Sequence, residues 1–315
     1  MNREANFQQA SGLTEGALSA GLDVAGCGLP YWIEAVAQGT WSGLVNGHLA
    51  QANVPEHMFA VGPLREALLE EFAFRSVGEE LATRALCYLV IHAPDRACME
   101  FYLTQALDEA RHSSVFRGHL LELGIAESDM EKVIARHAGE QIEAILKPLE
   151  AWVLQVVRDR KDFIGGVVLF TILIEGLLAP AAEISERKWR LIDPPAAQIE
   201  WGANVDEIRH LSVGASILKR HLRRNPTEKA RLLGLVEDGR RVWASLPADA
   251  VVLRRERLFQ AGMQDVRHLL RGYELAEGQP LLDTTPESRL ALVNEMTRRL
   301  QNGRLLAIGL EEALA

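Results

Sequence analysis

Two short segments of this chain carry the same pattern of side chains that can bind a metal. Residues 108–112 and residues 206–210 both read D-E-x-R-H. On a helix, residues three apart lie on one face, so the glutamate and the histidine of each copy project together. A single Glu-x-x-His is a weak signal, but its repetition predicts that two helices share one metal site. The predicted ligand pairs are Glu109 with His112 and Glu207 with His210.

A further glutamate, Glu79, stands where a third helix would bring it to the same site. The sequence predicts a helix from Pro63 to about His92, followed by a break at Pro94, because the residue before a proline disfavours helix. Glu79 and Glu109 lie at equal sequence distances on either side of Pro94. If two antiparallel helices turn there, both carboxylates lie at the same depth.

Glu80 competes with Glu79 for this role. Glu80 shares its helix face with Arg84, whereas Glu79 falls on the more apolar side of the same helix, which favours Glu79. The apolar residues that define that side are Leu69, Phe72, Leu86 and Val90.

The fourth candidate, Glu175, is the one carboxylate within the apolar run 170–178. An ionised glutamate without a partner among apolar side chains costs several kcal/mol, so Glu175 needs a metal or an arginine. We expect this helix to end near Lys188 and the next to begin at Pro194 or Pro195, since proline is favoured at a first helical position. Glu175 then lies at the depth of the second motif.

These residues together resemble the pattern of the ferritin-like di-iron carboxylate oxygenases and oxidases. That class includes the toluene and methane monooxygenase hydroxylase subunits and the small subunit of ribonucleotide reductase. The resemblance implies an all-α fold with a ferritin-like four-helix bundle over residues 63–222. Residues 1–62 would then form an N-terminal arm and helix, and residues 223–315 a C-terminal helical extension that packs on the bundle.

The resemblance also assigns roles to single residues and implies a cofactor. It implies two iron ions, with a mixed manganese and iron pair left open, and O2 as co-substrate. Asp108 and Asp206 would accept the second imidazole N–H of the histidine ligands, and Arg111 and Arg209 would pair with such acids. The implied metal ligands are Glu79 and Glu175 from single positions, Glu109 and Glu207 as bridging carboxylates, and His112 and His210.

Three positions depart from subgroups of that class. Phe116 occupies the place of the radical tyrosine of the ribonucleotide reductase small subunit, so a tyrosyl radical stored there is excluded. Ala179 replaces a threonine of the bacterial hydrocarbon monooxygenases, and Ala203 replaces an extra histidine ligand of the arylamine N-oxygenases. The site residues alone therefore do not show which subgroup of this class the chain resembles most.

Bulk composition narrows the range of partners. The net charge of −9 over 315 residues gives no reason to expect nucleic acid or an acidic membrane surface as a partner. Three cysteines without C-x-x-C spacing predict neither a disulfide framework nor a zinc site. No signal region and no uncharged run long enough to span a bilayer is found, so we expect a cytoplasmic protein.

The flanking segments receive simpler predictions. We expect residues 1–30 to form a loose arm, residues 31–51 a helix, and residues 125–161 the helical crossover between the two halves of the bundle. The tail is expected to form helices over residues 228–244, 251–271 and 286–308. His48 and His57 are interpreted as solvated or core histidines, and His119 as a supporting or surface histidine. None of the three is expected to be a metal ligand.

Three functions remain open at this point. The favoured one is an oxygenase that acts on a small organic substrate, by N-oxygenation of an amine, hydroxylamine or hydrazine-type compound or by C-hydroxylation, with an external electron donor and a homodimer as expected partners. The second is a radical-type or ferroxidase-like oxidase. The third is a structural bundle without metal, in which arginines pair with the acids.

Overall fold

The computed structural model describes residues 12–36 and 47–314 of the chain. This part is mostly helical, and the sheet found in it has two short antiparallel strands, β1 (Glu274–Ala276) and β2 (Gln279–Pro280). An all-α class is therefore confirmed. The longest helices are α3 (Pro63–His92), α4 (Arg96–Glu122), α9 (Pro194–Arg224) and α12 (Pro286–Ile308).

Helix ends follow local capping chemistry, which is why they were predictable. Asp95 accepts a hydrogen bond from the amide of Cys98 at 2.9 Å and starts α4, and Asp193 does the same for Ala196 at 3.1 Å and starts α9. Thr285 opens α12. The ends predicted for α3 at the two prolines and for α12 are confirmed.

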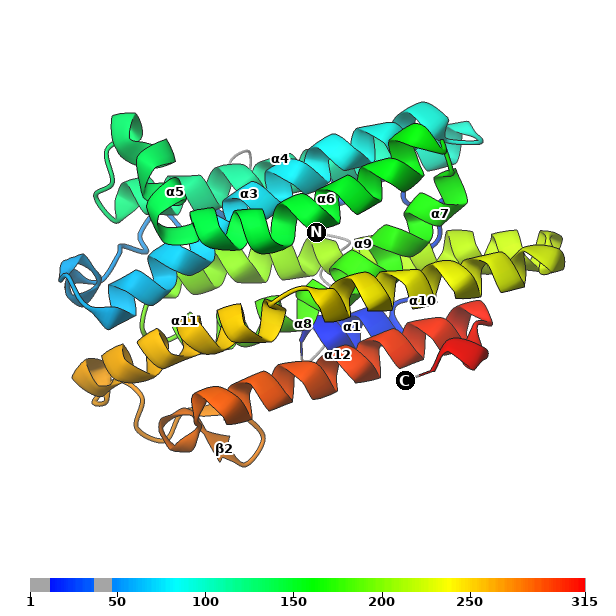
Figure 1. Cartoon of the computed structure of the whole chain (residues 1–315). Helices are drawn as coiled ribbons and strands as arrows, with labels where there is room; N and C mark the ends of the chain where they lie inside the picture. Colours follow the sequence, from blue (N-terminus) through cyan, green and yellow to red (C-terminus); the bar gives the residue numbers. More distant parts are fainter. Residues whose placement is uncertain (1–11, 37–46, 315) are drawn as a thin grey trace.

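Two helix pairs form the centre of the molecule (Figure 1). Helix α3 packs along α4, helix α8 packs along α9, and α4 also contacts α9. The predicted crossover is a chain of helical segments that lies on α3. Its segments are α5 (Met130–Gln141), the π-helical η5 (Ile142–Leu146), α6 (Lys147–Leu154) and the π-helical η6 (Gln155–Asp159), after which α7 (Phe163–Val168), the π-helical η7 (Leu169–Ile174) and α8 (Glu175–Trp189) follow.

The C-terminal helices pack against these pairs. Helix α11 (Ala248–Met263) lies on α3, and α12 lies on α8 and α9, while α10 (Lys229–Ser245) contacts η7. The predicted helix 251–271 is too long at its end, because α11 stops at Met263 and the chain turns into the β1–β2 hairpin. Sequence periodicity did not reveal this hairpin, whose strands have only three and two residues.

Two N-terminal predictions are wrong. Instead of a loose arm, the described residues 12–30 include α1 (Leu13–Ser19), whose Leu13 and Ala17 are buried against α8, α9 and α12. Instead of a helix over residues 31–51, α2 covers only Leu29–Ala35, and Val36 is extended. Residues 37–46 of that predicted helix lie outside the described residues, as do residues 1–11 of the predicted arm.

The most apolar helical run is a core element. Within the described residues, Phe163–Trp189 alone is long and apolar enough to cross a membrane, yet 78% of its most apolar window is buried inside the protein. This is consistent with a soluble protein.

A network of buried ion pairs joins the C-terminal extension to the central helices. Lys188 of α8 lies between Glu71 of α3, at 3.9 Å, and Glu256 of α11, which also pairs with Arg289 of α12. All four side chains are buried. Breaking one partner of such a network leaves an unpaired buried charge, so the network fixes the position of α11 and α12 on α3 and α8.

Candidate metal centre

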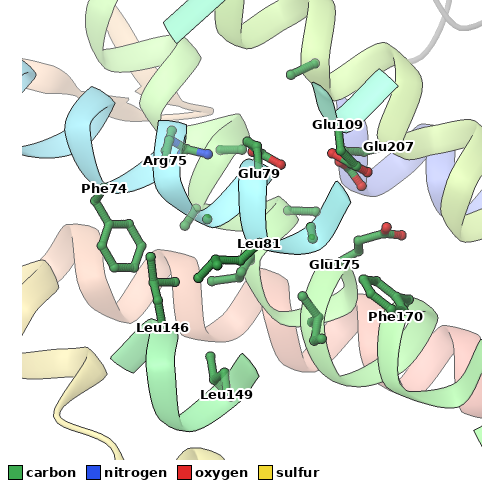
Figure 2. A pocket seen from close by; sticks show the side chains of 18 of the residues that line it. Phe74, Arg75, Glu79, Leu81, Glu109, Leu146, Leu149, Phe170, Glu175 and Glu207 are labelled. Carbon is green, nitrogen blue, oxygen red and sulfur yellow. The ribbon is translucent and has the colours of Figure 1, made fainter. Parts of the chain in front are cut away.

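Six side chains from four helices meet in the interior. They form two groups in which the potential ligand atoms lie within 4.8 Å of one another. Figure 2 shows the carboxylates of Glu109 and Glu207 side by side, with those of Glu79 and Glu175 reaching towards them. The first group is Glu79, Glu109 and His112, and the second is Glu109, Glu175, Glu207 and His210.

The geometry separates the glutamates by role. Glu109 belongs to both groups, as a carboxylate bridging two ions would, whereas Glu207 belongs only to the second. The bridging role implied for Glu207 therefore stays a prediction. Glu80 points away and pairs with Arg84 on the exposed surface, so the structure brings Glu79 and not its neighbour to the centre.

Each histidine turns the same nitrogen towards the centre. Nδ1 of His112 lies 3.0 Å from Glu109 Oε2, and Nδ1 of His210 lies 3.3 Å from Glu109 Oε1. The opposite nitrogens contact aspartates of the other motif copy: His112 Nε2 is 3.1 Å from Asp206, and His210 Nε2 is 3.3 Å from Asp108. A carboxylate on one ring nitrogen fixes the ring and leaves the other nitrogen free to bind a metal.

The arginines of the two motifs form ion pairs with the aspartates. Arg111 pairs with Asp206, and Arg209 pairs with Asp108 and, at 3.1 Å, with Asp206. The indole of Trp32 also donates to Asp108 at 2.9 Å. The two arginines therefore orient the aspartates that support the histidines.

Two imidazoles supply positive charge to the centre. Burial alone would lower the pKa of His112 and His210, but the surrounding carboxylates outweigh burial and raise the pKa of both rings well above the usual range. Burial, together with repulsion between neighbouring carboxylates, raises the pKa of Glu79, Glu175 and Glu207 above the usual range. Burial acts the same way on Glu109, but the His112 hydrogen bond and the nearby His210 imidazole outweigh it and lower the pKa of that carboxyl. Such a set of buried acids is stabilised by cations at its middle.

Several ligand atoms of the centre are buried without a hydrogen-bond partner among the described residues. An unsatisfied buried polar atom normally costs about 1–3 kcal/mol, and a cluster of such atoms could be satisfied by a bound metal ion. The donor set of carboxylates and imidazoles fits a pair of iron or manganese ions better than a structural zinc. The atoms without a hydrogen bond are Oε1 of Glu109, Oε2 of Glu175, Oε2 of Glu207 and Nδ1 of His210, of which Oε1 of Glu109 and Nδ1 of His210 lie at ion-pair distance from each other, 3.3 Å.

A π-helical segment sets the position of Glu175. Segment η7 ends at Ile174, directly before Glu175, and a π-helical turn rotates the residues that follow it relative to a regular helix. Two backbone carbonyls of η7 accept hydrogen bonds from the C-terminal helices. Gln301 of α12 donates to the Ile172 carbonyl at 2.8 Å, and Trp243 of α10 donates to the Leu173 carbonyl. The C-terminal extension therefore supports the metal centre.

Gly214 permits the close approach of α9 to η7. A Cβ at this position would lie 2.0 Å from the hydroxyl oxygen of the buried Thr171. Glycine thus brings α9, which carries the second motif, against the segment that carries Glu175.

Sequence reasoning missed one polar neighbour of the centre. Gln105 is buried and donates a hydrogen bond to Glu175 from α4. Its position four residues before Glu109, on the same helix face, was the available signal. Gln105 orients the one glutamate that follows the π-helical segment.

A cavity of about 150 Å³ opens beside the metal centre. Glu79, Glu109, Glu175 and Glu207 line one side of it, and the other walls are mainly apolar (Figure 2). From the sequence alone we expect five apolar side chains, Leu178 among them, to line the site. Leu178 does line the cavity, but the other four are core side chains that do not. These four are Phe72, Leu86, Phe116 and Ile172.

A second cluster of polar side chains lies apart from this centre. His48, interpreted as a solvated or core histidine, is buried, and its Nε2 lies 3.0 and 2.9 Å from the two carboxylate oxygens of Glu122. His119, for which a surface or supporting role was expected, is fully buried and contacts the same glutamate. The pairing depends on a contact between distant parts of the chain, which no local spacing reveals.

A scan against known protein families finds no match to this chain, and a search of curated proteins finds none either.

Proposed function

We propose that this chain is a ferritin-like di-iron oxidoreductase that uses O2 to oxidise a small organic substrate. The observation that supports this most is the pair of ligand groups sharing Glu109, with buried oxygen and nitrogen atoms that lack a hydrogen bond. The helix pairs α3–α4 and α8–α9 are consistent with the two halves of such a bundle.

Charge balance favours two divalent ions. Four ionised glutamates supply a charge of −4 and two neutral imidazoles none, so two divalent metals would make the buried centre neutral. Two ferrous ions would supply electrons to O2, and a manganese and iron pair is an alternative. One ion would be held by Glu79 and His112. The other would be held by Glu175, Glu207 and His210, and Glu109 would contribute to both sites.

The protein's own residues would orient the metal ligands and keep water away from the centre. Asp206 and Asp108 hold the two imidazoles with Nδ1 towards the metals, and Gln105 holds Glu175. The apolar side chains of the cavity, which include Leu149 and Leu178, limit water beside the centre. A protected site of this kind suits oxidation of a bound substrate.

The cavity suggests a substrate of modest size. Its volume is comparable to that of an engineered apolar cavity known to hold benzene. Arg75 and Arg255 also line it and offer positive charge at its wall. Our best candidate is N-oxygenation of an amine, hydroxylamine or hydrazine-type compound, with C-hydroxylation as the alternative, and an external donor would return the metals to the ferrous state.

The test is anaerobic loading with ferrous iron followed by rapid mixing with O2. We expect about two irons per chain, a transient visible absorption band, and product formation when small amines or hydroxylamines are supplied. Glu109→Ala should abolish all three, whereas Glu80→Ala, one position from Glu79 but on the surface, should change none of them.

Other outcomes would point to the alternatives. Iron in large excess over the number of chains would indicate ferroxidase storage. Absence of bound iron in both wild type and Glu80→Ala would refute the proposal and favour a structural bundle without metal. The ion pairs that Arg111 and Arg209 make with the aspartates are compatible with that structural alternative.

A further inference from the structure

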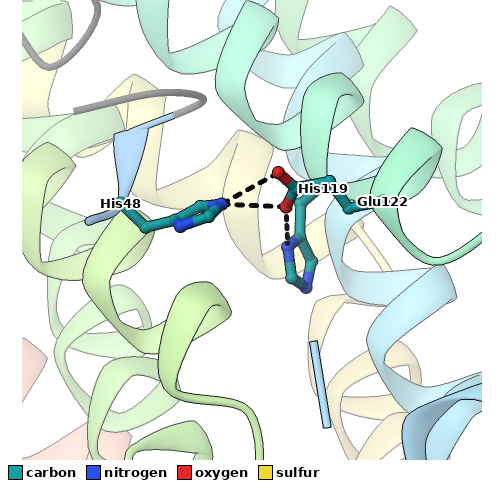
Figure 3. Close-up of side chains that lie close together, drawn as sticks. All are labelled: His48, His119 and Glu122. Atoms are coloured by element: carbon teal, nitrogen blue, oxygen red, sulfur yellow. Dashed lines mark hydrogen bonds and ion pairs between the residues drawn. The ribbon is translucent and has the colours of Figure 1, made fainter. Parts of the chain in front are cut away.

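We infer that His48, His119 and Glu122 form a second metal site, which binds one divalent cation of the zinc class. One potential ligand atom from each side chain lies within 4.8 Å of the others (Figure 3). His119 and Glu122 come from the last turns of α4, and His48 comes from the segment that precedes α3. Two imidazoles and one carboxylate are a frequent protein ligand set for zinc.

Both imidazoles are held in the orientation that metal binding requires. The Nδ1 of His48 contacts the Leu49 carbonyl oxygen at 3.0 Å, and the Nε2 of His119 contacts Asp193 at 3.1 Å. The opposite nitrogens face Glu122. A histidine that binds a metal usually donates its other N–H to a backbone carbonyl or a carboxylate, so both supports are already present.

Two of the three distances between the ligand atoms are close to those around a tetrahedral ion. Nε2 of His48 is 2.9 Å and Nδ1 of His119 is 3.2 Å from the same oxygen of Glu122. Ligands at about 2.0–2.1 Å from a tetrahedral zinc lie about 3.3 Å apart. A small adjustment of side chains would therefore admit an ion.

The local sequence explains why these groups meet. His119 and Glu122 are three residues apart on α4 and share a face. Asp193, which supports His119, is itself fixed as the residue that caps α9. Gly47 has a positive φ of 82°, which most residues avoid, and it directs His48 towards α4.

The site differs from the candidate di-iron centre. His119 is seven residues after His112, so it lies about 10 Å further along the same helix. The glutamate here is half-buried at the molecular surface, which gives an ion access and leaves a coordination position for water. An ion at this place would tie the segment around His48 to the end of α4 and the start of α9.

A protonated histidine is the competing explanation. His119 lies between Glu122 and Asp193, and the field of two carboxylates favours a positive charge, which a proton also supplies. A proton on His119, however, does not bring His48 into the same arrangement. The structure has both rings facing one carboxylate, with their planes at 84°, and one ion would bind all three groups at once.

The test is a zinc titration of the full chain with Glu109→Ala as background, because this substitution removes the ligand common to both groups of the other centre. We expect about one tightly bound zinc per chain, and X-ray absorption of the bound zinc should show imidazole ligands. His48→Gln in that background should weaken zinc binding by about 100-fold or more.

His57→Gln is the matched control, since the side chain of His57 makes its hydrogen bond with the Ile192 carbonyl, at 2.9 Å, and the substitution should leave zinc binding unchanged. Circular dichroism checks that each variant is folded. If the background variant is not folded, wild type and the two histidine variants are compared directly, and His48→Gln should bind about one zinc fewer than the other two. The inference is overturned if zinc binding is equal in His48→Gln and His57→Gln, if no tight zinc binds, or if the bound zinc has no imidazole ligand.

Discussion

Replacing Glu71 with glutamine tests whether buried ion pairs hold the C-terminal helices on the central helices that carry the candidate metal centre. Glu71 of α3 is buried, lies 3.9 Å from Lys188, and accepts a hydrogen bond from Trp189 at 3.2 Å. Burial alone would raise its pKa, but Lys188, with Arg255 and Arg75, outweighs burial and lowers the pKa from 4.5 to about 2.

The size of the effect follows from that shift. A pKa lowered by about 2.5 units corresponds to about 3 kcal/mol of folding free energy, at about 1.4 kcal/mol per unit. Because the folded pKa is depressed, this stabilisation is present above pH 4.5 and is lost as the pH falls towards 2. It should have fallen to less than half by about pH 3.

The assay is urea unfolding of wild type and Glu71→Gln between pH 7 and pH 3. We expect the variant to be less stable by about 3 kcal/mol at pH 7, with the difference shrinking below pH 4.5. Lys188 keeps Glu256, and Arg75 keeps Glu200, so these two cations still have an acidic partner after the change. Glu80→Gln, on the surface, should cost less than about 0.5 kcal/mol. A cost below about 1 kcal/mol, or one independent of pH, would refute the reasoning.

Three further predictions concern the support of the metal centre and the cavity. Gln301→Leu leaves the Ile172 carbonyl without its partner and should lower the free energy of unfolding by about 1–3 kcal/mol; an unchanged urea midpoint would contradict this. Gly214→Ala forces a contact with Thr171 and should cost about 1–3 kcal/mol by the same measurement, unless α9 can shift freely. Ala182→Phe fills the cavity and should abolish substrate oxidation while the iron content stays unchanged; equal turnover would mean that the substrate binds elsewhere.

Local chemistry made much of the fold predictable. Prolines and capping aspartates act within a few residues, so the sequence alone indicated where α3 and α12 begin and end and where α9 begins. Equal spacing about Pro94 placed Glu79 and Glu109 at one depth, and the structure brings both into one ligand group. Those inferences needed only helix geometry.

Features that depend on contacts between distant segments were not predictable. The short helix α1 is stabilised by burial of Leu13 against other helices, which its own sequence does not reveal. The π-helical η7 depends on Gln301, 129 residues away from the carbonyl that it holds. The cluster around Glu122 likewise needs His48, 74 residues earlier in the chain. Tertiary packing decides such features, and periodicity reports only one helix at a time.

The central claim is that six side chains bind a pair of metal ions sharing Glu109, and Mössbauer spectroscopy of the protein loaded with ⁵⁷Fe and then exposed to O2 tests it most directly. Our account predicts about two irons per chain as a magnetically coupled pair in wild type, and loss of the coupled pair in Glu109→Ala. Isolated ferric ions without magnetic coupling, or a coupled pair that persists in Glu109→Ala, would contradict it.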